Sequence, residues 1–200
     1  MNRYYPHLAI IISALLWSLD AFLRQSLYSL SPLLVITLEH GIGSLLFAPI
    51  LISNWIKLKP LKQTVWISLL WISILGGICG TYFYTKALSY VGYIDLSVVV
   101  LLQKFQPLFA VSLAAIILKE KLSKRYLILA LFAMIGGYLV TFGSSPIPIG
   151  DNNTLIAALF SLLDAFCWGS STELGKQALI FLPYSVVTAL RLIITTIVGA

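Results

Sequence analysis

The segment GYIDLSVVVLLQKFQPLFAVSLAAIILKEKLS, Gly92–Ser123, decides the fold class of this chain of 200 residues. It contains an almost unbroken apolar run, Ile94–Leu118, whose roughly 25 residues would rise about 37 Å as a helix, enough to cross a bilayer with some tilt. The run is interrupted near its middle by Gln103, Lys104, Gln106 and Pro107. Polar and charged side chains at that depth are costly in hydrocarbon, so they predict a wet or protein-lined interior.

The composition agrees with a membrane protein. Hydrophobic residues make up 60% of the chain and charged residues 10%, whereas soluble domains carry roughly 25% charged residues. The net charge of +6 does not indicate nucleic-acid binding, because the basic residues form short clusters between apolar runs. Both cysteines, Cys79 and Cys167, fall inside apolar runs and are interpreted as small buried residues rather than a disulfide framework.

The apolar runs predict an all-α fold, a polytopic membrane helix bundle of about seven transmembrane helices. The expected spans are Leu8–Tyr28, Leu33–Ile56, Val65–Tyr84, Ile94–Leu118, Tyr126–Phe142, about Thr154–Leu174, and Pro183 to the end. The first run is too long for a cleaved signal and is interpreted as a helix. Lysine and arginine place the N-terminus in the cytoplasm, because the inner side receives Arg3, Lys57, Lys59, Lys62, Lys119, Lys121, Lys124, Arg125 and Lys176, and the outer side little beyond Lys86 and Asp151.

A weak internal repeat links the two ends of the chain. A shift of 151 positions places four residues of the first two spans on residues of the last two: Trp17 on Trp168, Pro32 on Pro183, Thr37 on Thr188, and His40 on Arg191. Five spans precede the second copy, and an odd number inverts it in the membrane. Inverted repeats around a site near the membrane midplane are a recurring plan of secondary transporters.

Several short motifs occur in an order that resembles the EamA-type proteins of the drug/metabolite transporter superfamily. They are Leu16-Trp17-Ser18, Ser31-Pro32, Tyr84-Thr85-Lys86-Ala87-Leu88-Ser89-Tyr90, Pro107, Leu118-Lys119-Glu120-Lys121-Leu122-Ser123, Gly136-Gly137 and Cys167-Trp168-Gly169. The resemblance implies two inverted five-helix repeats, a central cavity, and transport of small metabolites, commonly export, across a bacterial-type inner membrane.

On this resemblance, residues 1–143 form the first five-helix repeat, 144–153 an outer connecting loop, and 154–200 the first two helices of a second, incomplete repeat. About three further helices are expected. The chain departs from the family pattern at His40, where an arginine is common, and this departure leaves an anion-binding role at that position open.

Charged residues of the first two spans form the first part of the predicted site. Trp17, Asp20 and Arg24 share one helix face. Asp20 and Arg24 either pair as a structural lock or face the cavity and change partner during transport. A bridge from Arg24 to Glu39 is expected to compete with the bridge to Asp20. His40 either takes part in proton coupling or is held by a hydrogen bond to a neighbouring helix.

The fourth and sixth spans supply the second part. Gln103 and Gln106 are expected on one helix face, with Lys104 about 100° away and a kink caused by Pro107. Lys104 either faces the cavity or is a buried partner of Glu39 or Asp164. Trp168 mirrors Trp17 in the repeat, so the two either stack on a substrate or simply pack. Glycines 76, 77 and 80 predict close helix packing.

The leading hypothesis is a secondary transporter that exports a small polar metabolite, such as an amino acid, by alternating access. The expected substrate-binding residues are Trp17, Asp20, His40, Gln103, Lys104 and Trp168. The expected gating or ion-pair residues are Arg24, Glu39, Pro107, Asp164 and Arg191. Protons, the lipid bilayer and a second copy of the chain are candidate partners. No cofactor, metal or nucleic acid is expected, and motifs typical of an enzyme are missing. The alternatives are an incomplete or accessory membrane subunit and an intramembrane enzyme.

Overall fold

The computed structural model describes residues 5–27, 29–58, 61–119, 121–143 and 152–200. These residues are helical apart from turns and one isolated bridge between Val91 and Ile94. The predicted all-α polytopic bundle is therefore confirmed. Four residues that the sequence assigned to loops, Arg3, Lys59, Glu120 and Asp151, lie outside the described part, as does most of the predicted loop 144–153.

The helices follow the predicted spans closely. They are α1 (Tyr5–Gln25), α2 (Pro32–Ser53), α3 (Trp55–Leu58), α4 (Gln63–Trp71), the π-helical segment η1 (Ile72–Cys79), α5 (Gly80–Leu88), α6 (Leu96–Gln103), α7 (Gln106–Leu118), α8 (Lys124–Phe142), α9 (Asn152–Phe181) and α10 (Tyr184–Gly199). With α4, η1 and α5 counted as one helix and α6 and α7 as another, six are long and apolar enough to cross a membrane, and α10 is a shorter apolar helix.

Local capping explains where α2 begins and ends. The Ser31 hydroxyl accepts a hydrogen bond from the Leu34 N–H at 3.2 Å, and Pro32 takes the first helical position, where its missing N–H costs nothing. The helix ends at Ser53 rather than at the predicted Ile56. The cause is Asn54, whose side-chain amide donates to the Ile50 carbonyl at 2.8 Å and closes the last turn.

Two other predicted ends were too early. The third span continues past Tyr84 to Leu88, because Ala87 and Leu88 are also buried. The sixth span was expected to end near Leu174, but α9 continues to Phe181. Its extra turns bury Ala178, and they are supported at the surface by an ion pair from Lys176 Nζ to Glu173 Oε2 at 2.7 Å.

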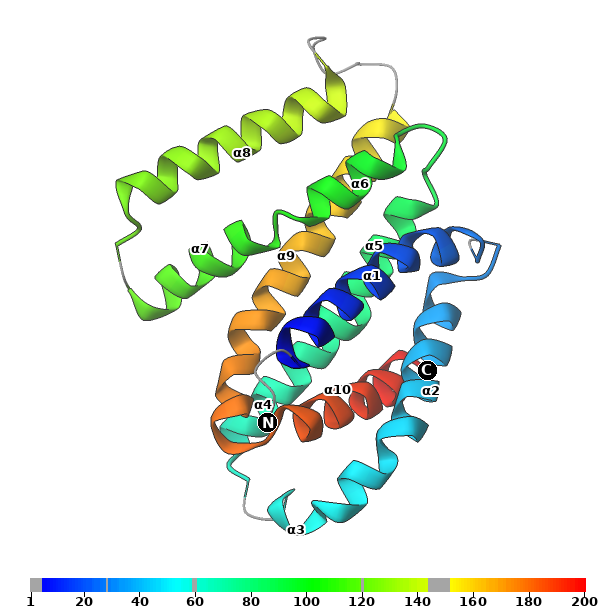
Figure 1. The fold of residues 1–200 in the computed structure, drawn as a ribbon, viewed down its shortest axis with the longest axis vertical. Helices are drawn as coiled ribbons and strands as arrows, with labels where there is room; N and C mark the ends of the chain where they lie inside the picture. The colour runs from blue at the N-terminus through cyan, green and yellow to red at the C-terminus, as the bar shows by residue number, and fades with distance from the viewer. Residues whose placement is uncertain (1–4, 28, 59–60, 120, 144–151) are drawn as a thin grey trace.

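The fourth span is broken rather than merely bent. α6 ends at Gln103 and α7 begins at Gln106, with Lys104 and Phe105 between them. Pro107 has no N–H, so it cannot bond to the carbonyl of Gln103 four residues earlier, and the helical hydrogen-bond pattern stops there. The kink predicted at Pro107 is therefore present as a break, and a short non-helical connection joins α6 to α7 (Figure 1).

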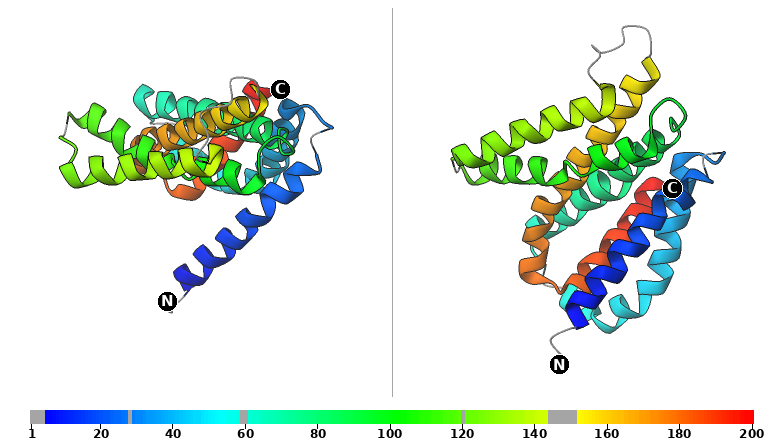
Figure 2. Two further views of the ribbon diagram at one scale, coloured as in Figure 1. Left: turned by 90° about the horizontal axis from the view of Figure 1, so that it is seen from above. Right: turned by 45° about the horizontal axis from the view of Figure 1, so that its top comes forward.

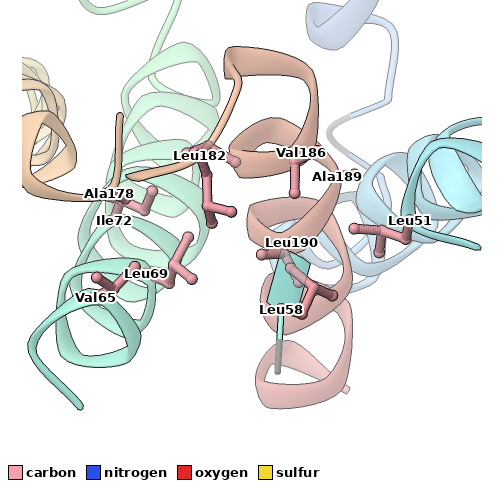
Figure 3. Packing of buried hydrophobic residues seen from close by; sticks show 11 residues of the cluster. Leu51, Leu58, Val65, Leu69, Ile72, Ala178, Leu182, Val186, Ala189 and Leu190 are labelled. Atoms are coloured by element: carbon pink, nitrogen blue, oxygen red, sulfur yellow. The ribbon is translucent and has the colours of Figure 1, made fainter. Parts of the chain in front are cut away.

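Helix α9 is the centre of the bundle and packs against α4, η1, α5, α6 and α7, while α10 packs along α2 (Figure 1). The N-terminal part of α1 leans away from the other helices, and α7 and α8 lie together to one side (Figure 2). A hydrophobic cluster joins α4, the end of α9 and α10 to α2 and α3; its labelled members are Leu51, Leu58, Val65, Leu69, Ile72, Ala178, Leu182, Val186, Ala189 and Leu190 (Figure 3).

The predicted close packing at the glycines of the third span is confirmed. A Cβ atom added at Gly76 would lie 2.8 Å from Cβ of Ser171 on α9, and one added at Gly77 would lie 2.8 Å from Cγ2 of Thr195 on α10. Side chains larger than hydrogen would therefore push η1 away from both helices. This close approach brings the backbone of η1 to the wall of the candidate site.

Candidate functional site

A cavity of about 540 Å³ lies where α1, α2, η1, α5, α7, α9 and α10 meet. Its lining includes seven of the predicted site residues: Trp17, Asp20, Arg24, Glu39, His40, Trp168 and Arg191. The remaining lining residues are Ser13, Leu16, Gly76, Thr81, Gln106, Ser171 and Thr172. A volume of this size is typical of sites for small molecules, which occupy roughly 300–1,000 Å³.

Arg24 is the centre of the charged side of the cavity. Its Nη2 lies 2.8 Å from Oε2 of Glu39 on α2 and 3.1 Å from Oδ1 of Asp20, while Nε donates to Oδ2 of Asp20 at 3.2 Å. Nη1 donates to the hydroxyl of Thr85 on α5 at 3.2 Å. The expected competition between Asp20 and Glu39 is wrong for this conformation, because the fork-shaped guanidinium binds both carboxylates at once.

His40 and Arg191 line the cavity from α2 and α10. The buried His40 ring places Nδ1 3.0 Å from the carbonyl of Ile36, one turn back in its own helix, so the expected bond to a neighbouring helix is wrong. Arg191 and Glu39 both interact electrostatically with this ring. Nε of Arg191 is buried and has no hydrogen-bond partner in the structure, so the cavity holds a guanidinium with an unused donor.

Two tryptophans form the aromatic side. Trp17 and Trp168 meet edge to face, with ring centroids 5.2 Å apart and planes at 70°. Nε1 of Trp168 donates to the carbonyl of Gly76 at 2.8 Å. A Cβ atom added at Gly80 would lie only 2.5 Å from Cδ1 and Nε1 of this indole, so the absence of a side chain at Gly80 makes room for the ring. The α9 indole is thus held by the backbone of η1, whereas Trp17 is 45% exposed and its indole forms no such hydrogen bond within the described part of the chain.

Lys104 lies on the other side of Trp17. Its Nζ is 5.6 Å from the centroid of the Trp17 ring, a cation–π contact, and the lysine is exposed. It lines a second cavity of about 920 Å³ between α1, α5 and α6, and Trp17 lines both cavities. Lys104 forms no ion pair with Glu39 or Asp164 in the described structure, so the alternative of a buried ion-pair partner is wrong.

Three further predicted residues lie away from the charged cavity. Gln103 and Asp164 are fully buried between α6 and α9, and Pro107 is exposed at the start of α7. The expectation that Gln103 and Gln106 share one helix face is wrong. The break after Gln103 sends that side chain into the protein, while Gln106 lines the cavity.

Sequence reasoning missed four hydroxyl-bearing residues at the site. Thr81 and Thr85 are four apart in the third span, and Ser171 and Thr172 follow Trp168 by about one turn. Thr85 orients Arg24, and the others line the cavity. Their spacing relative to the charged residues could have indicated a shared site. Serine and threonine are common in membrane spans, however, because each can bond to the backbone of its own helix, so their presence alone does not indicate a site.

The site therefore combines an aromatic pair with charges of both signs and several hydroxyl groups. Such a surface can stack on a flat ring and bond to polar groups of either charge. Among the described residues, no three histidine, cysteine, aspartate or glutamate side chains gather as metal ligands would.

A polytopic helix bundle with a polar cavity among its spans is the architecture of a membrane transporter. Residues 5–142 match the model of the EamA-like transporter family, and the chain belongs to that family. The chain is also similar to the riboflavin transporter ImpX of Fusobacterium nucleatum, with 35% identity over 198 residues. The similarity covers 98% of this chain and 66% of the relative, so the chain spans about two thirds of that protein. No solved structure matches the chain.

Both findings point to transport of small molecules across a membrane rather than to an enzyme. They agree with the predicted resemblance and with the multi-pass membrane location. A transporter also requires a solute and a lipid bilayer as partners.

Proposed function

We propose that the protein is a secondary transporter that binds riboflavin, or a metabolite of the same chemical type, in the cavity between Trp17 and Arg24. The observation that carries this proposal is the pairing of two tryptophans with a charged network in one cavity of about 540 Å³. The name of the similar Fusobacterium protein favours riboflavin among ring-containing solutes.

The chemistry of riboflavin suits the two sides of the cavity. Its flat tricyclic ring presents a large aromatic face, and Trp17 with Trp168 can stack on such a face. Its ring carbonyls and chain of hydroxyl groups need donors and acceptors. Arg191 has an unused donor, and Glu39, which is 47% exposed at its side chain, can accept.

An amino acid is the second candidate, as predicted from the sequence. The observation that favours it is the presence of Arg24, Arg191 and Glu39 around one cavity, because a zwitterion needs a cationic and an anionic partner at a short separation. An amino acid leaves much of the cavity empty, whereas riboflavin fills more of it. Volume therefore favours riboflavin.

We further propose alternating access between two inverted repeats, residues 1–143 and a second repeat to which residues 154–200 belong. Its support is the pairing of α2 with α10, the helices that the 151-residue shift makes equivalent. Gly43 on α2 would place a Cβ atom 3.2 Å from the Leu192 side chain on α10, and the Ser44 and Thr196 hydroxyls lie 3.2 Å apart. The proposed orientation keeps the N-terminus in the cytoplasm, and the proposed direction is export.

The test is transport of labelled riboflavin by the full-length protein in liposomes, measured in both directions, with unlabelled amino acids as competitors. Asp20→Asn and Lys104→Ala are each expected to lower the transport rate about 100-fold or more with normal membrane insertion. Asp20 lines the cavity together with Trp17, and Lys104 contacts the Trp17 ring, so each substitution removes a charge next to the aromatic side of the site. Lys124→Ala, an exposed residue at the start of α8, is the matched control and keeps the rate. Unchanged transport in both variants would refute the site.

A further inference from the structure

The described site leaves one pair of buried polar residues without a role. Gln103 is the last residue of α6 and Asp164 lies in the middle of α9; both are 0% exposed. Their side chains interact across the helix interface, yet both amide atoms and both carboxyl oxygens lack a hydrogen bond of acceptable geometry. These are four of the five unsatisfied buried side-chain atoms found in the described residues. Buried polar atoms are normally satisfied, so this concentration requires an explanation.

The chemistry of the two groups supplies the explanation. An ionised carboxylate only accepts hydrogen bonds, and it would repel the amide oxygen of Gln103. A protonated carboxyl group has one donor and one acceptor, and a primary amide has both as well. Small rotations then allow the Asp164 hydroxyl to donate to Oε1 of Gln103 while Nε2 of Gln103 donates to the other carboxyl oxygen. This arrangement satisfies all four atoms, and it removes the cost of burying an unpaired charge.

We propose that Asp164 and Gln103 form a proton-binding site that links α9 to the break between α6 and α7. With the proton bound, the acid and the amide hold the end of α6 against α9. When the proton leaves, the O–H bond breaks, its electron pair stays on the carboxylate, and the proton passes to water in the cavity beside Lys104.

The charged groups around Asp164 determine which cation its ionised carboxylate can attract. The charged and titratable groups that interact with Asp164 are Arg24 of α1, Lys104 in the break, Tyr84 of α5 and Cys167 of α9. Arg24 is already bound by two other carboxylates. Lys104 is exposed, and within the described residues its side chain is held only by its contact with Trp17, so it is the cation that can move toward Asp164.

Movement of Lys104 connects this site to the substrate cavity. The lysine would leave the Trp17 ring, and Trp17 is one half of the aromatic pair that lines the cavity. Loss of the proton therefore loosens Trp17. This last step rests on the proposed transport function, whereas proton binding by Asp164 does not.

The site is tested without any substrate by infrared difference spectroscopy of the full-length protein in lipid membranes, between about pH 5 and pH 9. Wild type is expected to show the carbonyl band of a protonated carboxylic acid, which disappears as the pH rises. Asp164→Asn is expected to lack the band, and Gln103→Leu to shift it. Ser161→Ala, one turn earlier on α9 and equally buried, is the control and keeps it.

Two outcomes of the spectra overturn the proposal. If wild type and Asp164→Asn give the same spectra, then Asp164 does not carry a proton. If the band persists at every pH, then the proton is not released. Asp164→Asn keeps a similar shape and hydrogen-bonding capacity, so correct folding is expected and is checked by gel filtration.

A transport assay then separates the two proposals. The wild-type rate is expected to change about tenfold over two pH units, and the Asp164→Asn rate to be independent of pH. A pH-dependent rate in Asp164→Asn overturns the coupling. If the wild type shows the infrared band but carries no riboflavin, the proposed substrate fails while the proton site stands.

Discussion

Helices α8 and α9 have nearly equal mean hydropathy, yet they have opposite surroundings. Over the most apolar 18 residues of each, 56% of α9 is buried in the protein against 6% of α8. The difference lies in residue size and polarity. α9 presents alanine, serine, glycine and one aspartate to its neighbours, whereas α8 presents leucine, isoleucine and phenylalanine outward. Hydropathy thus indicates that a helix can cross a bilayer, and small residues decide whether it packs against protein.

The largest effect, a loss of stability, is expected from a glycine substitution on α9, with a matched substitution on α8 as the control. In Gly169→Leu on α9, the new Cβ atom meets the backbone oxygen of Gln106 at 2.7 Å and Cβ of Phe109 at 3.1 Å, so α7 must move. A loss of about 3 kcal/mol or more of stability is expected. In Gly136→Leu on α8, nothing lies within 4 Å of the added Cβ atom, and little change is expected. Thermal unfolding in detergent measures both, and equal losses would remove the distinction between the helices.

A smaller effect, on transport rather than folding, is expected when Arg24 is replaced, and Arg125 serves as the control. Arg24→Gln leaves Asp20 and Glu39 without their shared cation, so the transport rate should fall about 100-fold. Arg125→Gln, on the exposed first turn of α8, should leave the rate within about twofold. Initial rates in liposomes give the comparison, and a similar loss in both would mean that net charge, not the Arg24 network, matters.

The smallest effect is expected at the end of α9 itself. Lys176 is exposed, and its only ion-pair partner among the residues that the structure describes is Glu173, three residues earlier. Lys176→Gln should therefore change the free energy of unfolding by less than about 1 kcal/mol. Chemical denaturation is the measurement. A loss as large as that of Gly169→Leu would show that position along α9, rather than burial, controls its stability.

Much of the fold could be predicted from the sequence, because crossing a bilayer requires long apolar runs that are directly visible. The equivalence of Trp17 and Trp168 was also visible, through the repeat that aligns them, but their direct contact was not predicted. The orientation of Gln103 and Lys104 was not. A helical periodicity assumes an unbroken helix, and here the break after Gln103 turns that residue inward and Lys104 toward Trp17.

The neutral partners of the site were also hidden. Thr85 bonds to Arg24 across 61 positions of sequence, and only the packing of α1 on α5 creates that contact. The close approach of η1 to α9 was partly visible in the three glycines, but the widened π-helical turns were not. No residue pattern in the third span distinguishes them from α-helix.

The hydrogen bond from Trp168 to the main chain of η1 determines which substitutions are tolerated at positions 76 and 168. Its acceptor is the carbonyl of Gly76, which every amino acid possesses, so no substitution at position 76 can delete that oxygen. Variants at 76 therefore fail only through bulk, whereas variants at 168 fail through the missing indole hydrogen. In a saturation survey, alanine and serine would be the best replacements at the first position, and none would equal tryptophan at the second.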